Sequence, residues 1–262
     1  MQETVRVLML GDVIGDPGLR ALFAGLPGLI KKTRADLVVA NGENAAGGFG
    51  INREAAERMF SVGIDVITTG NHVWEKKDAG ALLDSDPRIL RPANYPPGAP
   101  GSGFRAFEKD GVSWLVLSLQ GRERLYPIDC PFRTAKDILK HHRGAIAVVD
   151  FHAESTEEKE ALGFHLDSEV SVVAGTHTHV QTADERVLPG GTGYITDLGM
   201  SGPGDSVIGV KTDICLRRSL TQMPLKMESA EGEAGIQGAL FEVEVRTRKA
   251  RSVVRIRAEI TP

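Results

Sequence analysis

The most informative stretch of this 262-residue sequence is residues 172–179, which read Val-Val-Ala-Gly-Thr-His-Thr-His. The short apolar, β-branched run predicts a buried strand. Gly175 follows it, and a glycine lets the backbone turn sharply out of a sheet. In extended backbone, His177 and His179 would point to the same side, because side chains alternate along a strand. We therefore expect a strand whose carboxyl end presents two imidazoles.

The same arrangement recurs along the chain, where other strand-like runs also end in residues that can bind a metal. Gly-Asp and Gly-Asn pairs are common turn formers, so one such pair alone says little. Their recurrence favours a shared site, because ligands of open α/β sheets gather beyond the carboxyl ends of the strands. The residues that follow strand-like runs in this way are Asp12, Glu43, Asn44, Asn71, His72, His152, His177 and His179.

Strand-like and helix-like segments alternate, which predicts an α/β fold and, by default, a single domain over residues 1–262. Helical spacing covers residues 53–62 and 156–164, the second capped by Ser155 or Thr156. Residues 133–142 also suggest a helix. The last third differs, since residues 238–246 and 250–260 predict an antiparallel hairpin. Strands are expected at residues 5–10, 37–40, 65–69, 114–119, 145–149 and 170–174, and a long surface loop at 91–103.

The composition is that of an ordinary globular protein and excludes a disordered chain, with 41% hydrophobic and 25% charged residues. The net charge of -4 gives no global reason to bind nucleic acid. No run reaches the roughly 18 to 20 apolar residues of a membrane-spanning helix, and we see no signal-peptide pattern. Cys130 and Cys215 lack CxxC spacing, which argues against a zinc ribbon or a disulfide framework. We expect a cytoplasmic protein.

The chemistry of the candidate residues favours a two-metal centre. Carboxylates, amide oxygens and imidazoles suit Fe, Mn, Zn or Ni ions. The candidate ligands exceed the needs of one ion, whereas a pair of ions that share a carboxylate uses them all and serves phosphoester hydrolysis. Three further histidines, His141, His142 and His165, are expected at helix ends, where a polar or positive side chain suits the helix dipole.

In their order, these residues resemble the motifs of the calcineurin-like metallophosphoesterase superfamily: an early Asp-x-His, a Gly-Asp block, Gly-Asn-His, a lone His and Gly-x-His-x-His. Ile14 stands where the first histidine is usual, and Glu43 replaces the usual bridging aspartate. Both departures are similar to the YmdB-like branch, in which the asparagine after the glutamate replaces the missing histidine ligand. Residues 91–96 and 196–203 also look like that branch.

The resemblance implies a two-layer β-sandwich flanked by helices and a phosphodiesterase for 2′,3′-cyclic nucleotides. A metal-bridging hydroxide would attack phosphorus, and His72 would stay uncoordinated as the general acid. Iron is the favoured metal, with Mn or Zn as alternatives. One ion would be held by Asp12, Glu43, Asn44 and His179, and the other by Glu43, Asn71, His152 and His177, so that Glu43 bridges them.

Other interpretations remain open from the sequence alone. The same centre could serve a phosphomonoesterase, or the protein could bind a nucleotide or RNA in a regulatory role with little turnover. Residues 199–204 are either a loop over the pocket or a plain turn. The spacing of Gly11, Gly15 and Gly18 lacks the start of a dinucleotide-binding motif, and no Gly-x-Ser-x-Gly motif of a serine hydrolase is present. A homo-oligomer is expected.

Overall fold

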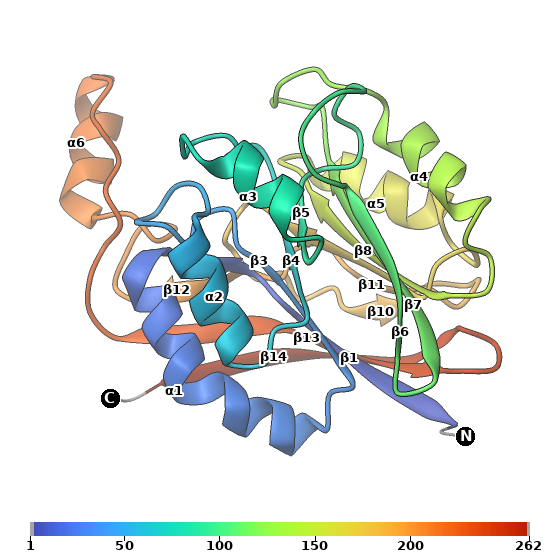
Figure 1. Cartoon of the computed structure of the whole chain (residues 1–262). Coiled ribbons are helices and arrows are strands. Elements are labelled where there is room, and N and C mark those ends of the chain that lie inside the picture. The colour runs from blue at the N-terminus through green and yellow to red at the C-terminus, as the bar shows by residue number, and fades with distance from the viewer. Residues whose placement is uncertain (1–2, 261–262) are drawn as a thin grey trace.

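The computed structural model describes residues 3–260, and its two β-sheets pack face to face with helices on both outer sides (Figure 1). The larger sheet has eight strands in the order β2-β12-β13-β1-β3-β4-β5, with β14 paired to β13. Strands β1, β3, β4 and β5 run parallel. Its strands are β1 (Thr4–Leu10), β2 (Asp12–Val13), β3 (Leu37–Asn41), β4 (Val66–Thr68), β5 (Ile89–Leu90), β12 (Met200–Pro203), β13 (Ala234–Glu244) and β14 (Ala250–Ile260).

The second sheet has six strands in the order β10-β11-β9-β8-β7-β6. Its central strands β7, β8, β9 and β11 are parallel, and each edge strand is antiparallel to its neighbour. The strands are β6 (Phe104–Lys109), β7 (Val112–Gln120), β8 (Ile146–His152), β9 (Val172–Thr176), β10 (Arg186–Val187) and β11 (Gly193–Ile195).

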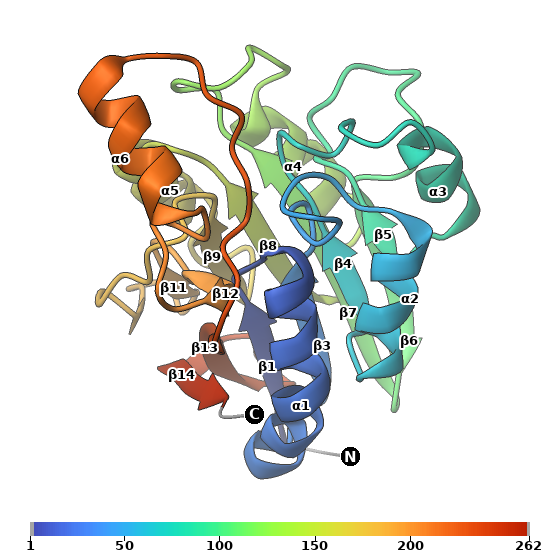
Figure 2. The same cartoon turned by 90° about the vertical axis from the view of Figure 1, so that its left-hand side faces the viewer.

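Three apolar layers separate the helices and sheets, and alternate residues of one strand enter different layers. Val7 and Met9 of β1 lie between the sheets, whereas Leu8 and Leu10 face the helices of the first sheet. Helices α1, α2 and α3 cover that sheet (Figure 2), and α4 and α5 cover the second. The helices are α1 (Gly15–Thr33), α2 (Arg53–Ser61), α3 (Ala79–Ser85), α4 (Pro131–Leu139), α5 (Thr156–His165) and α6 (Thr212–Thr221). The expected sandwich flanked by helices is confirmed.

Most predicted elements are present, with shifted ends. The C-terminal hairpin forms, but β13 begins at Ala234, and β8 continues to His152. The helix expected at residues 133–142 is wrong at both ends, because α4 begins at Pro131 and ends at Leu139, so His141 and His142 lie beyond it. Ser155 is the cap of α5, and its side chain accepts a hydrogen bond from the Glu158 amide.

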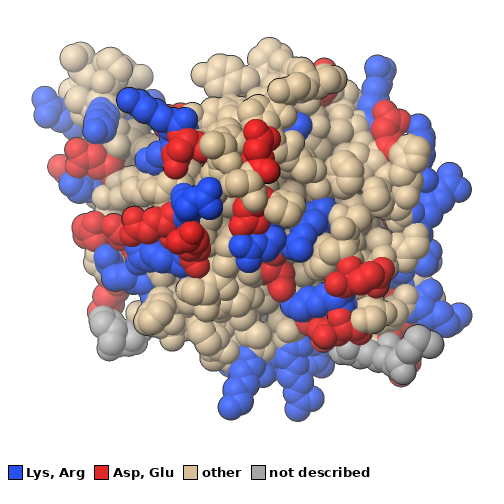
Figure 3. Space-filling model, viewed as in Figure 1, with Lys and Arg blue, Asp and Glu red and all other residues tan. Residues whose placement is uncertain are grey.

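The surface agrees with the small net charge. On the face shown in Figure 3, Lys and Arg side chains are interspersed with Asp and Glu side chains. Within residues 3–260, no helix has the length and apolar character needed to cross a bilayer.

Candidate metal centre

The predicted site residues meet where the carboxyl ends of strands from both sheets face each other. Six of them approach one another through side-chain contacts: Asp12, Glu43, Asn44, His152, His177 and His179. Asn71 joins them through His152, and His72 lies beside them. A cavity of about 510 Å³ opens onto this group. All eight predicted residues therefore lie within this group or directly beside it, and five of them also line the cavity: Glu43, Asn44, His72, His177 and His179.

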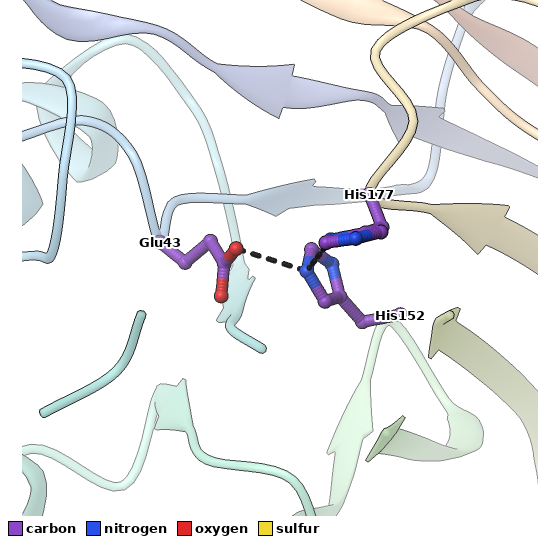
Figure 4. Close-up of side chains that lie close together, drawn as sticks. All are labelled: Glu43, His152 and His177. Carbon is purple, nitrogen blue, oxygen red and sulfur yellow. Dashed lines mark hydrogen bonds and ion pairs between the residues drawn. The ribbon is translucent and has the colours of Figure 1, made fainter. Parts of the chain in front are cut away.

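His152 is the centre of the first half of the site. Its Nε2 atom lies 2.9 Å from Glu43 Oε1, 3.1 Å from Asn71 Oδ1 and 3.0 Å from His177 Nδ1. Figure 4 shows Glu43, His152 and His177 pointing toward one another from the ends of β3, β8 and β9. Each of the three side chains offers one possible ligand atom, and these atoms all lie within 4.8 Å of one another. In the described part of the chain, they form the group of side chains that could hold a metal ion.

These atoms fit a transition-metal ion. Glu43 is fully buried, and its Oε1 has no hydrogen-bond partner despite the short approach to His152. Its Oε2 accepts a hydrogen bond of 3.0 Å from the His72 amide. Ligand bonds of about 2.0 to 2.2 Å place neighbouring ligand atoms about 3 Å apart. An ion among these atoms would satisfy the unpaired oxygen and share the nitrogen lone pairs.

A buried network sets the tautomer of His152. The Thr176 hydroxyl donates to Asp150 Oδ1 at 2.7 Å and can therefore accept from His152 Nδ1, which lies 2.9 Å away. With its proton on Nδ1, His152 presents an unprotonated Nε2 toward the site. Burial raises the pKa of Asp150 to about 6, partly opposed by hydrogen bonds from Thr68 and Thr176, so its carboxylate is ionised at neutral pH.

The second half of the site surrounds Asp12. Its Oδ1 lies 3.6 Å from His179 Nε2, and the Asn44 side-chain nitrogen lies 3.4 Å from that Oδ1 and 3.3 Å from Nε2. Turning the Asn44 amide over would put its oxygen in the same position, where it could act as a third metal ligand. Asp12 Oδ2 accepts a hydrogen bond of 3.0 Å from the His177 amide, which ties the two halves together.

Among the described side chains of the site, the histidines are the ones that can balance the negative charges of Asp12 and Glu43. Burial would lower the pKa of His179, but the charge of Asp12 and a hydrogen bond to it raise the pKa to about 9. Burial would likewise raise the pKa of Asp12, and His179 and His152 lower it below its ordinary value. Burial lowers the pKa of His177 to about 3. Positive charge is therefore required here, as protons or as cations.

His72 lies at the cavity without joining either half. Its backbone amide holds Glu43, whereas its ring packs edge-on against Phe49 with centroids 5.1 Å apart. Its Nδ1 lies 3.4 Å from Glu75 Oε1. Beside these contacts the ring also lines the cavity, where it can face a ligand.

Two local explanations from the sequence are wrong although the residues meet. His177 and His179 have φ angles of 102° and 63°, so they leave β9 in a left-handed turn and are not in extended backbone. Gly175 does not have a positive φ, and a Cβ there would lie 1.8 Å from the Thr196 carbonyl oxygen; at Gly70, which precedes Asn71, a Cβ would lie 2.1 Å from the His152 ring. At Gly11, a Cβ would lie 2.0 Å from the Gly199 carbonyl oxygen. At these positions, the missing side chain allows neighbouring groups to pack closely and is not needed for a turn.

Sequence reasoning missed several residues around the site. Glu154 Oε2 lies 3.1 Å from His177 Nε2, and its place two residues after His152 was an available signal. Asp150 precedes His152 by two residues on the same strand. Phe49 and Arg218 also line the cavity, and no local pattern connects Arg218 of α6 with it. His142 and His165 pack against Phe104 and Phe132 in the second half of the fold.

Known proteins resemble this chain over nearly its whole length. The family model of the YmdB-like protein matches residues 8–256. A 2',3'-cyclic-nucleotide 2'-phosphodiesterase of Bacillus subtilis (strain 168) is 41% identical over 254 residues, which is 96% of each chain. A putative phosphatase/phosphodiesterase of Mycoplasma pneumoniae is 34% identical and covers 98% of this chain and 94% of its own.

Solved structures agree. A hypothetical protein from Thermus thermophilus superposes with a TM-score of 0.92 at 41% identity, covering 98% of this chain and 100% of its own. A novel phosphatase from Mycoplasma pneumoniae has a TM-score of 0.94 at 34% identity, with 100% and 96% covered. NAD nucleotidase from Haemophilus influenzae shares the fold alone, with a TM-score of 0.61 at 14% identity over 98% of this chain and 56% of that one.

Proposed function

Because this chain belongs to the YmdB-like protein family, we propose that it is a metal-dependent phosphodiesterase that hydrolyses 2′,3′-cyclic nucleotides. The observation that carries the proposal is the unpaired Glu43 Oε1, fully buried and 2.9 Å from His152 Nε2. Such an atom is expensive to bury unless a cation satisfies it. The relative from Bacillus subtilis supplies the substrate class.

The residues divide between two ions. Asp12, Asn44 and His179 would hold one, Asn71, His152 and His177 the other, and Glu43 would contact both. Bound ions of this kind activate water and neutralise the phosphate oxygens. We propose iron as the principal metal, in a divalent or mixed-valence pair, with Mn or Zn as alternatives. Metal analysis of the purified protein tests the identity.

His72 is the proposed general acid. Its ring lines the cavity, and only its backbone amide contacts the ligand group, so the ring can approach the scissile bond. A positioned imidazole contributes about 10² to 10⁴ in rate by proton transfer. His72 would protonate the 2′ oxygen as it leaves, which gives a 3′-nucleotide.

Phe49 and Arg218 are the proposed substrate contacts on the cavity wall. The ring of Phe49 offers an apolar surface for a base. Among the described residues that line the cavity, Arg218 is the one with a Lys or Arg side chain. Its Nη1 contacts Met227 Sδ at 3.2 Å rather than a carboxylate. Its charge remains available to a phosphate.

The decisive experiment compares three substrates on metal-loaded protein: 2′,3′-cyclic AMP, bis-p-nitrophenyl phosphate and p-nitrophenyl phosphate. We expect hydrolysis of the cyclic nucleotide with 3′-AMP as product, and the highest kcat/KM for it. A preference for p-nitrophenyl phosphate would instead make the protein a phosphomonoesterase. Tight binding of the cyclic nucleotide without product would indicate a regulatory protein.

The assembly and location are also proposals. Helix α6 buries no residue within the chain: its Leu216 and Leu220 are 57% and 83% exposed, and Met223, just past its end, is 57% exposed. An isolated helix of this length is marginal in water, so contact with a second copy would explain it. We propose a homo-oligomer, which light scattering tests. Both cysteines are free, which agrees with the proposed cytoplasmic location and is tested by cell fractionation.

A further inference from the structure

The turn that carries His177 and His179 needs support from outside itself. Both histidines adopt positive φ angles, and such backbone persists only where surrounding contacts hold it. Thr178 lies between them. Each histidine belongs to a different half of the site, since His177 contacts His152 and His179 contacts Asp12. A shift of this turn would therefore misplace a ligand on both sides.

Asp197 binds this turn through hydrogen bonds. Its Oδ2 accepts hydrogen bonds from the Thr178 amide at 3.2 Å and from the Thr178 hydroxyl at 2.9 Å. Its Oδ1 accepts from the Gly199 amide at 2.9 Å, and the Gly199 carbonyl accepts in turn from the Asp12 amide at 3.2 Å. One carboxylate is thus connected to the backbone of three predicted ligands.

Lys159 holds Asp197 from the opposite side. Its Nζ lies 2.7 Å from Asp197 Oδ2, with side chains only 2% and 1% exposed. In every other ion pair of a Lys or Arg within the described residues, both side chains are at least 18% exposed. The stem of Lys159 also crosses Gly175, where a Cβ would lie 2.9 Å from its Cδ.

Stability alone does not explain this pair. Desolvation offsets much of the attraction in a buried ion pair, and apolar residues of similar volume often do as well. A charge placed here does give strong, directional hydrogen bonds to Thr178. We propose that Asp197, fixed by Lys159, is a positioning residue that sets the His177-Thr178-His179 turn and so places one imidazole in each half of the metal site. The inference rests on the proposed function only in taking these histidines as ligands.

The sharpest test is Thr178→Val, because it removes one hydroxyl bond to Asp197 and leaves the Lys159 pair intact. The matched control is Thr192→Val, since the buried Thr192 hydroxyl donates to the Val170 carbonyl at 2.8 Å and accepts from the Ser168 amide at 3.2 Å, away from Asp197. Asp197→Asn is the stronger variant. All are studied as full-length, metal-stripped protein titrated with Co²⁺ and followed by its visible absorption spectrum.

We expect Thr178→Val and Asp197→Asn to bind Co²⁺ about 10- to 100-fold more weakly, the loss typical of removing a group that orients metal ligands. Their spectra should also change, and in turnover kcat should fall while KM changes little. Thr192→Val should keep the wild-type affinity and spectrum. If Asp197→Asn fails to fold, Thr178→Val decides alone.

Wild-type Co²⁺ affinity and spectrum in Thr178→Val would overturn the inference, as would an equal loss in Thr192→Val, which would indicate general destabilisation. The proposed function fails separately, when the wild-type protein binds Co²⁺ but releases no product from a cyclic nucleotide. The two failures are therefore distinguishable.

Discussion

Glu43 is the side chain of the site that most needs a nearby cation, because it is fully buried and its Oε1 lacks a hydrogen-bond partner. If it bridges two ions, removing it should release both. We predict that Glu43→Ala retains fewer than one ion per chain and has background activity. Metal analysis by mass spectrometry checks this. Glu75→Ala is the control, since Glu75 lies beside His72 but outside the ligand group. Two ions per chain in Glu43→Ala would show that Glu43 does not bridge.

His72 should affect chemistry without affecting metal content. We predict that His72→Ala lowers kcat for 2′,3′-cyclic AMP by about 10² to 10⁴ and leaves the ions in place, because only its backbone contacts Glu43. The loss should be much smaller with bis-p-nitrophenyl phosphate, whose leaving group needs no proton. Steady-state kinetics on both substrates provides the measurement. Equal losses on the two would argue against a general acid.

The meeting of the candidate ligands at one place could be predicted from the sequence, but their local geometry could not. Polar residues such as Asn71 and His152 stand directly after apolar runs, and that contrast is visible in one dimension. The left-handed turn at His177 is hydrogen-bonded through Thr178 to Asp197, which lies 19 positions further along the chain. Glu154 contacts His177, and Asp150 is connected to His152 through Thr176. Their polarity alone did not distinguish them from ordinary surface or strand residues.

At the level of elements, apolar β-branched runs predicted the long buried strands, and helix α1 was missed. Pro27 and several glycines interrupt its helical pattern, yet α1 runs from Gly15 to Thr33. Tertiary packing overrides propensity here, because Leu22 and Leu26 are buried against the first sheet. Short strands such as β10 and β11 have two or three residues, too few for any period to show.

Helix α6 supplies the element-scale prediction. We expect Arg218→Ala to raise KM for 2′,3′-cyclic AMP about 10- to 100-fold with kcat nearly unchanged, since a hydrogen bond to a charged group contributes about 1.5 to 3 kcal/mol. Arg217→Ala, one residue earlier on the same helix and outside the cavity lining, is the matched control. Kinetics of both variants checks the assignment. Equal effects of the two substitutions would mean that charge near the cavity matters, and not this contact.

For the whole molecule, alternating strands and helices predicted an α/β fold, whereas the packing of two sheets rested on the family resemblance. Along β1, Leu8 and Leu10 face one layer while Val7 and Met9 face the other, so both sides are apolar and no alternation is visible. The site lies across this division. Glu43 follows β3 of the first sheet, and His152 ends β8 of the second.

Metal binding should therefore link the two sheets and stabilise the whole fold. An ion that binds only the folded state contributes about 4 kcal/mol per site at a free concentration of 1,000 Kd. For a chain of this size, each kcal/mol shifts the unfolding temperature by roughly 2 to 4 °C. We predict that chelation lowers the midpoint of wild-type protein by roughly 10 °C or more, and that readdition of metal restores it. Calorimetry measures the shift, with Glu43→Ala as a control that should respond to neither treatment. Equal unfolding midpoints for stripped and loaded wild-type protein would contradict this coupling. In that case, protons on the histidines would balance the charges of buried Asp12 and Glu43 as effectively as cations do.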